Sequence, residues 1–216
     1  MYKYVLFDLD GTLTDSAEGI IKSVEYALQQ MGEPTEGRLD QHTVIGPPLK
    51  TTFQNVYGFS KEKADQTYAY FQERYDSVGK FENRAFPGIV PLLRNLQAAG
   101  VRSFVATSKP EVHAKAICEK FGIAPYVEKI AGPAVGGTDS KADVMRRILA
   151  HIGTYSPDEV VMVGDRRFDV LGARETKVPV ILVGFGYGND AERKAYPPDF
   201  FAPTVADLRQ LLLPET

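Results

Sequence analysis

The sequence has few of the residues on which several classes of protein depend. It contains one cysteine, Cys118, which excludes an intrachain disulfide. Its three histidines, His42, His113 and His151, are scattered and lack the spacing of metal ligands. The formal net charge of -3 lacks the basic excess that proteins binding nucleic acids usually show. These absences argue against a disulfide scaffold, a histidine metal centre and a general nucleic-acid-binding protein.

Long apolar runs are also missing. No run approaches the roughly 20 residues that span a bilayer. The chain begins without the basic leader and short apolar stretch of a secretory signal. We therefore expect no membrane partner and a cytoplasmic location. The length of 216 residues suffices for one large core, or for one core with a smaller inserted domain.

The stretch around which the chain is organised lies near its start. Residues 2–7 form an apolar run rich in β-branched and aromatic side chains, which predicts a buried strand. Asp8 and Asp10 follow, and alternate residues of an extended chain point the same way, so both carboxylates can face one pocket. Gly11 permits a sharp turn. A bound Mg²⁺ or a division between nucleophile and general acid would explain two adjacent carboxylates. A plain strand followed by an Asp-Gly turn is the alternative.

Residues 16–81 show helical periodicity broken by glycine and proline, and no convincing strand. From Phe86 onward the pattern alternates between helices and apolar strands. This alternation predicts an α/β fold, a Rossmann-like doubly wound parallel sheet with helices on both faces. We expect a discontinuous core of residues 1–15 and 82–216, with a small helical domain of residues 16–81 inserted into it. The strands after the first are expected at residues 101–107, 127–131, 160–164 and 180–183.

Parallel sheets place ligands at the carboxyl ends of their strands, and polar residues gather at those ends here. Thr107, Ser108 and Lys109 follow the second strand and precede a helix start, whose free amides suit a phosphate. Ser108 as a simple helix cap is the alternative. Lys141 opens a later helix, although the helix dipole disfavours a lysine there. Asp165 ends the strand at 160–164.

Asp169 lies four residues after Asp165 and so can share the same site. The alternative is that Asp169 only caps the N-terminus of a helix. Three further features carry weaker expectations. The repeat Gly184-x-Gly186-x-Gly188 lacks the helix register of a dinucleotide-binding fingerprint, so we interpret it as a loop. Arg166 and Arg167 are expected to be exposed charges, and contact of one of them with an acidic substrate is the alternative. Cys118 is expected to pack in a core, because no cationic partner is evident that would make it a catalytic thiol.

The string from Phe7 to Ser16, Phe-Asp-Leu-Asp-Gly-Thr-Leu-Thr-Asp-Ser, resembles the first motif of the haloacid dehalogenase-like hydrolase superfamily. Thr107 with Ser108, Lys141, and Gly-Asp165-x-x-x-Asp169 match the second, third and fourth motifs in order and spacing. The helical insertion matches the position of the C1 cap. The stretch at residues 45–49 and the Thr-Ser-Lys-Pro string resemble the phosphoglycolate phosphatase-like branch.

The resemblance implies a Mg²⁺-dependent phosphatase that passes through an aspartyl-phosphate. Asp8 would be the nucleophile and Asp10 the general acid and base. Thr107 and Lys141 would contact the phosphoryl group. Lys109 competes with Lys141 for the third-motif role, or reaches the substrate together with Ser108 and Gly11. Asp8, Asp10 through its carbonyl, Asp165 and Asp169 would form the metal site, and the cap would close over it.

The expected substrate is a small phosphorylated metabolite such as phosphoglycolate, pyrophosphate or a nucleotide, with a monomer or homodimer as the expected assembly. A phosphomutase acting on a sugar phosphate would retain Asp10 and is one alternative. A non-catalytic binding protein on the same fold is another. The presence of Asp8, Asp10, Lys141 and Asp165 together counts against it, because such a protein is expected to have lost at least one of them.

Overall fold

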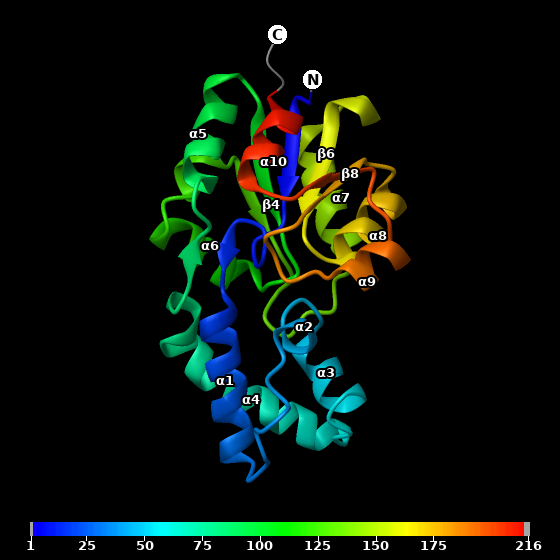
Figure 1. Ribbon diagram of the computed structural model, residues 1–216. Coiled ribbons are helices and arrows are strands. Elements are labelled where there is room, and N and C mark those ends of the chain that lie inside the picture. The colour runs from blue at the N-terminus through cyan, green and yellow to red at the C-terminus, as the bar shows by residue number, and fades with distance from the viewer. Residues whose placement is uncertain (1, 214–216) are drawn as a thin grey trace. The chain divides into compact units, whose positions relative to one another are not determined.

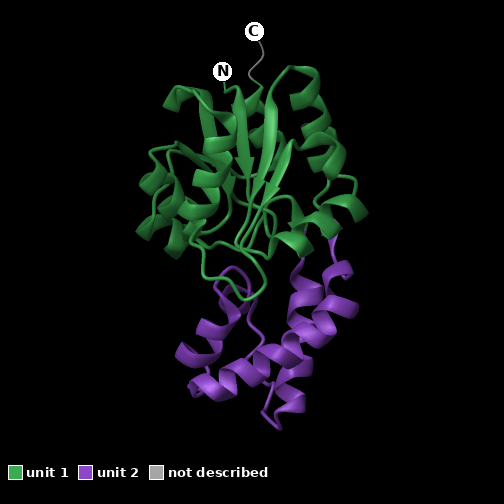
Figure 2. Cartoon of the chain, turned by 180° about the vertical axis from the view of Figure 1, so that it is seen from behind, with its two compact units in different colours: residues 1–14, 85–216 green, residues 15–84 purple. Residues whose placement is uncertain are grey.

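The computed structural model describes residues 2–213, and the chain divides into two compact units. Unit 1 runs up to Thr14 and again from Ala85 onward, and unit 2 is Asp15–Arg84 (Figure 2). The chain passes between the units at β2 (Thr14–Asp15) and β3 (Arg84–Ala85), which pair in a two-stranded sheet. The inserted segment therefore leaves and rejoins the core at one place.

Unit 2 is built from helices. Ser16 occupies the N-cap position of its first helix without a side-chain hydrogen bond, whereas the Ser60 hydroxyl accepts the amide of Lys63 and caps the longest helix. The first and longest helices pack against each other through apolar faces. The elements are α1 (Ala17–Gln30), α2 (Gln41–Val44), α3 (Leu49–Asn55), α4 (Lys61–Ser77) and the 3₁₀ turn η1 (Gly79–Phe81).

Unit 1 contains a six-stranded sheet in the order β5-β4-β1-β6-β7-β8, in which every neighbouring pair is parallel (Figure 1). This confirms the predicted α/β fold. The sixth strand was not expected, because three residues followed by a proline give no recognisable pattern. The strands are β1 (Tyr4–Phe7), β4 (Arg102–Ala106), β5 (Lys129–Ala131), β6 (Val160–Gly164), β7 (Val180–Val183) and β8 (Phe200–Ala202).

Helices cover both faces of this sheet, and the alternation of side chains along the strands decides what each face contacts. Val5 and Phe7 of β1 point into a core shared with α5, α6 and α10, while Leu6 points into the opposite core with α7 and α8. The helices and 3₁₀ turns of unit 1 are α5 (Ile89–Ala98), α6 (Glu111–Lys120), η2 (Ala124–Tyr126), α7 (Lys141–Ile152), η3 (Pro157–Glu159), α8 (Arg167–Thr176), α9 (Asp190–Ala195) and α10 (Val205–Leu212).

Two sequence expectations concern these helices. Cys118 is fully buried in α6, and burial raises the pKa of its thiol to about 12, so it is a packing residue. Among the described residues, no helix combines the length and apolar character needed to cross a membrane.

The order of the strands in the chain reverses at the centre of the sheet. Successive strands after β1 extend to one side through β4 and β5, and the chain then returns to β6 on the other side of β1. In open parallel sheets the crevice at such a reversal is where ligands bind. Asp8 directly follows β1 and Asp165 directly follows β6, so two of the expected site residues flank the reversal.

Candidate active site

The turn after β1 is held by backbone hydrogen bonds that fix the first carboxylate. The amide of Asp8 donates to the carbonyl of Val163 at 2.8 Å, and the amide of Leu9 donates to Asp8 Oδ1 at 2.7 Å. Gly11 has a φ of +80°, and a Cβ there would lie 2.1 Å from Asp165 Oδ2. Gly11 is therefore required both by the turn and by the close approach of Asp165.

Lys141 lies at the centre of the carboxylate cluster. It is the first residue of α7, and its side chain is 3% exposed. Its Nζ is 2.9 Å from Asp8 Oδ1 and 2.8 Å from Asp169 Oδ1. It also donates to the carbonyl of Ala106 at the end of β4, at 3.0 Å. This ammonium thus joins the ends of three strands, β1, β4 and, through Asp169, β6.

Burial governs the protonation of this cluster. Burial raises the pKa of Asp8 to about 6, against the attraction of Lys141. Burial also raises the pKa of Asp165 well above its usual range, and the carboxylate of Asp169 adds to the effect. Burial lowers the pKa of Lys141, but Asp169 and Asp8 outweigh this and hold it above its ordinary value. One cation thus faces three buried carboxylates, which leaves the charge unbalanced.

The oxygens of Asp8, Asp165 and Asp169 lie within 4.8 Å of one another, a spacing suited to a metal ion. Asp165 Oδ2 accepts the amide of Tyr187 at 2.7 Å, while Asp165 Oδ1 is buried and has no hydrogen-bond partner among residues 2–213. Asp169 is different, because its Oδ2 accepts the amides of Asp165 and Arg166, at 3.2 and 3.0 Å, and its Oδ1 contacts Lys141. Hard carboxylate oxygens and excess negative charge fit Mg²⁺.

Asp10 lies outside this carboxylate cluster. Its Oδ2 is 2.8 Å from Lys109 Nζ, and both side chains are largely buried. Thr107 is buried, and its hydroxyl accepts the amide of Lys109 at 3.2 Å. Ser108 is exposed, and the N-cap position of α6 is Pro110, so Ser108 is not the cap of that helix. The two lysines are thus divided, Lys109 beside Asp10 and Lys141 beside Asp8.

The glycine-rich loop after β7 contacts Asp165 and Gly11, a role that we did not expect from the sequence. Besides the amide of Tyr187, it brings Gly186 against Asp165 and the turn after β1: an added Cβ would be 2.3 Å from the carbonyl oxygen of Gly11. The expected exposure of Arg166 is wrong, since this residue is 5% exposed and ion-paired with Glu192. The spacing of the three glycines was the signal available in the sequence, because close backbone approach requires residues without Cβ.

We expect Gly186→Ala to destabilise the protein by about 1–3 kcal/mol, the usual cost of overpacking. The new methyl meets backbone and the Cβ of Asp165, which cannot move without shifting the site. Urea unfolding followed by circular dichroism measures the change. Gly122→Ala is the control for metal affinity: no atom lies within 4 Å of its added methyl, although its φ of +72° gives that alanine a backbone strain of its own. Metal affinity should fall in Gly186→Ala and stay constant in Gly122→Ala, and equal metal affinity of the two variants would contradict the assigned close contact.

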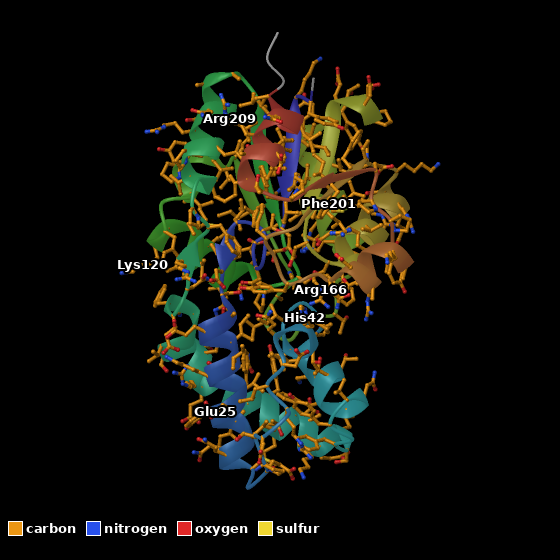
Figure 3. All side chains as sticks on the ribbon, in the orientation of Figure 1. Glu25, His42, Lys120, Arg166, Phe201 and Arg209 are labelled. Atoms are coloured by element: carbon orange, nitrogen blue, oxygen red, sulfur yellow. The ribbon has the colours of Figure 1, made fainter. Side chains whose placement is uncertain are left out.

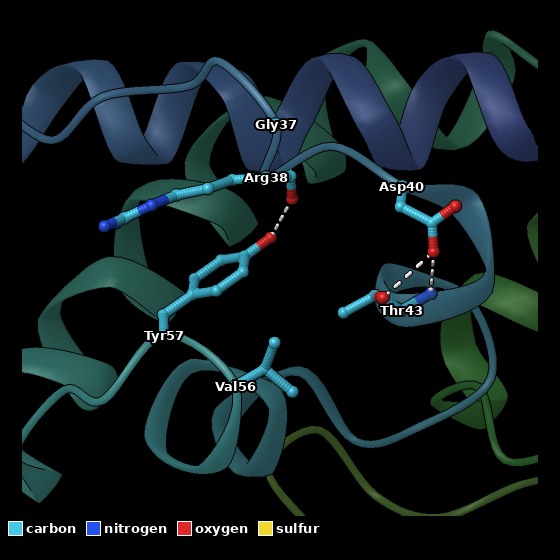
Figure 4. A pocket seen from close by; sticks show the side chains of 6 residues that line it. All are labelled: Gly37, Arg38, Asp40, Thr43, Val56 and Tyr57. Carbon is cyan, nitrogen blue, oxygen red and sulfur yellow. Dashed lines mark hydrogen bonds between the residues drawn. The ribbon is translucent and has the colours of Figure 1, made fainter.

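A separate hollow of about 180 Å³ lies within unit 2 and is shown in Figure 4. Its polar groups satisfy one another: the Tyr57 hydroxyl donates to the carbonyl of Arg38, and Asp40 Oδ2 accepts the amide and hydroxyl of Thr43 at 3.0 and 2.9 Å. These are turn and capping contacts. We therefore assign the chemistry to the carboxylate cluster of unit 1.

Comparison with known proteins identifies the family of the chain. The family model for haloacid dehalogenase-like hydrolases matches residues 5–183. The chain is 40% identical to a 5'-nucleotidase of Pseudomonas aeruginosa, over 98% of this chain and 96% of that protein. It is 41% identical to the tyrosine-protein kinase PtkA of Mycobacterium tuberculosis, over 96% of this chain and 72% of that protein.

A solved structure extends the agreement to the fold. The crystal structure of a predicted phosphatase from Clostridium acetobutylicum superposes with a TM-score of 0.92 at 40% identity, covering 99% of both chains. The family match covers β1 through β7 and hence all four groups of candidate residues. The chain therefore belongs to the haloacid dehalogenase-like hydrolases.

Proposed function

We propose that this protein is a Mg²⁺-dependent phosphatase that hydrolyses a small phosphorylated metabolite through an aspartyl-phosphate on Asp8. The observation that carries the proposal is the placement of Asp8 at the reversal of strand order. Its carboxylate ends the central strand, 2.9 Å from the buried ammonium of Lys141 and within 4.8 Å of the carboxylates of Asp165 and Asp169. The carboxylate can attack phosphorus because the ammonium of Lys141 on one side, and a metal ion held by the carboxylates on the other, would neutralise the negative charge of the phosphoryl oxygens.

The reaction has two steps that the side chains can perform. A carboxylate oxygen of Asp8 bonds to phosphorus while the bond from phosphorus to the leaving oxygen breaks, and Asp10 gives that oxygen a proton. Asp10 then takes a proton from a water that attacks phosphorus, the bond to Asp8 breaks, and inorganic phosphate leaves. Lys141 and Thr107 hold the phosphoryl oxygens throughout, with Ser108 and the turn at Gly11 available to position the substrate.

The residues that would hold Mg²⁺ are Asp8 and Asp165 through carboxylate oxygens and Asp10 through its carbonyl. Asp165 Oδ1, which has no hydrogen-bond partner among the described residues, supports this choice. Asp169, whose oxygens already contact Lys141 and two amides, would orient Asp165 instead of binding the ion directly. When bound, Mg²⁺ supplies positive charge that offsets the carboxylates and the phosphoryl oxygens.

The name of the Pseudomonas relative makes nucleoside monophosphates the first substrates to test, followed by phosphoglycolate and pyrophosphate. The name of the mycobacterial relative describes transfer of a phosphoryl group to tyrosine. The identities of the two relatives to this chain are nearly the same, 40% and 41%, so their names do not choose between acceptors. A general base at Asp10 serves water, a tyrosine hydroxyl or a sugar hydroxyl alike. We take water as the acceptor because the matching family model is that of hydrolases. A phosphomutase would use the same aspartyl-phosphate with a sugar phosphate as acceptor.

We expect hydrolysis to depend on divalent metal. EDTA should lower phosphate release by at least about a hundredfold, because the charge of three carboxylates and the substrate is then uncompensated, and added Mg²⁺ should restore it. The assay compares an aryl phosphate, nucleoside monophosphates, phosphoglycolate, pyrophosphate and sugar phosphates, with a tyrosine peptide as a competing acceptor. A rate of hydrolysis that EDTA does not change would contradict the proposed dependence on a divalent metal. Phosphotyrosine or an isomerised sugar phosphate in place of inorganic phosphate would contradict hydrolysis.

A further inference from the structure

Glu192 on α9 makes a buried contact with the turn that carries Asp165. Its Oε1 accepts from Arg166 Nε at 3.1 Å and from the amide of Arg167 at 2.5 Å, and its Oε2 accepts from Arg166 Nη2 at 3.1 Å. The Arg166 side chain is 5% exposed and that of Glu192 is 12% exposed. Arg166 is labelled in Figure 3.

The position of this contact in the sequence ties it to the candidate metal site. Arg166 and Arg167 follow Asp165 directly, and Arg167 is the first residue of α8. The amide of Arg167 is one of the unpaired donors that every helix start presents, and the negative charge of Glu192 suits the positive end of the helix dipole. Asp169 takes the neighbouring amides of Asp165 and Arg166. Two carboxylates thus fix three successive amides.

One segment contacts the turn at residues 165–167 in two places. Residues 186–192, which we call the clamp segment, place the amide of Tyr187 on Asp165 Oδ2 at 2.7 Å and the carboxylate of Glu192 on the two arginines. Between them Gly188 lies against the turn, and a Cβ there would be 2.1 Å from the carbonyl oxygen of Asp165. The Asn189 side chain accepts the amide of Glu192 at 2.8 Å, which caps α9 and sets the direction of Glu192.

We propose that Glu192 is a positioning residue for the metal site: by anchoring the clamp segment to Arg166 and Arg167, it holds the carboxylate of Asp165 within 4.8 Å of the carboxylates of Asp8 and Asp169. The inference rests on the proposed function, in that the metal is Mg²⁺. Glu192 acts through Asp165 and touches neither the substrate nor the ion. The burial of the Arg166 pair makes the anchor depend on both partners, because removing one leaves a buried charge alone.

The test uses Glu192→Gln, which keeps the size of the side chain and loses its charge. We expect Mn²⁺ binding, measured by electron paramagnetic resonance, to weaken by about ten- to a hundredfold, as is usual when groups behind a metal ligand are lost. Glu175→Gln is the matched control: it removes the same charge by the same substitution outside the clamp segment, its side chain is 58% exposed, and it pairs with Arg146, whose side chain is 49% exposed. Its Mn²⁺ affinity should equal that of the wild type.

A second measurement does not depend on metal. In EDTA, amide hydrogen exchange at Tyr187, Arg166 and Arg167 should be faster in Glu192→Gln than in the wild type, while exchange in β4 stays the same. Glu192→Asp, which keeps the charge, should recover part of both effects, and it serves in place of Glu192→Gln if that variant does not fold. Unchanged Mn²⁺ affinity in a folded variant would overturn the proposal. If the wild type bound no divalent metal, the proposed function would fail, and unchanged exchange would then separately overturn the clamp.

Discussion

Asp8→Asn is expected to lower phosphatase turnover by at least about a thousandfold, since an amide cannot form the acyl-phosphate that both steps require. Steady-state phosphate release with saturating Mg²⁺ measures the loss. Wild-type enzyme quenched in acid during turnover should carry phosphate on Asp8, and the variant should carry none. Asp158→Asn, at an exposed aspartate, is the control and should keep full activity.

The same substitution should not weaken the fold in the absence of metal. Burial raises the pKa of Asp8 to about 6, so the folded state binds this proton more tightly than the unfolded chain. The wild type therefore loses stability as pH rises from about 4 to about 6, and the variant, with no group to titrate, does not. In EDTA at pH 7.5, Asp8→Asn should unfold at a higher urea concentration than the wild type. Turnover above a tenth of wild type would show that Asp8 is not the nucleophile.

Lys141→Met should have the largest effect on stability. It leaves the buried carboxylates of Asp8 and Asp169 without the ammonium that contacts both, at 2.9 and 2.8 Å. Removing one partner of a buried ion pair typically costs about 3–5 kcal/mol. Urea unfolding in EDTA at pH 7.5 should show this loss, and hydrolysis should be absent. Lowering the pH toward 5 should recover part of the stability, because protonation of Asp8 removes one of the uncompensated charges.

Two comparisons test the origin of that loss. Asp8→Asn combined with Lys141→Met should be more stable than Lys141→Met alone, because one of the two unpaired carboxylates is gone. Lys109→Met removes the ammonium beside Asp10 instead, at 2.8 Å, and should leave the stability effect of Asp8→Asn unchanged. If Lys141→Met were as stable as the wild type, the charge of Asp8 would not depend on Lys141, and retained hydrolysis would contradict the proposed role of Lys141 in the reaction.

Most of the core, and the approach of the candidate site residues to one another, could be predicted from the sequence. Apolar runs that end in Asp8, Thr107 and Asp165 predict parallel strands, and the ends of parallel strands meet. The approach of Lys141 to Asp8 is harder to predict, because it depends on how α7 packs against the sheet. The strand β8 (Phe200–Ala202) was missed, since it is too short to show a period.

The contact of Glu192 with Arg166 could not be predicted from the sequence, for a different reason. The two side chains form an ion pair, but α9 is only six residues long and follows the glycine-rich loop. A helix this short shows no periodic pattern from which the contact could be predicted. An arginine in a surface-type context is ordinarily solvated. Its burial depends on a partner from another element, and pairings between elements are what single-sequence patterns do not record.

The central position of β1 has a consequence for how the protein is made. Tyr4 pairs with Arg102 on one side and with Val160 on the other, so the first strand to be synthesised has neighbours only from much later parts of the chain. Such distant pairings form slowly and require long loops to close first. During translation one edge of β1 can pair only after β4 has emerged from the ribosome, and its other edge stays unpaired until β6 has emerged. Chains truncated before β6 should therefore leave one edge of β1 exposed and depend more on chaperones than the full chain.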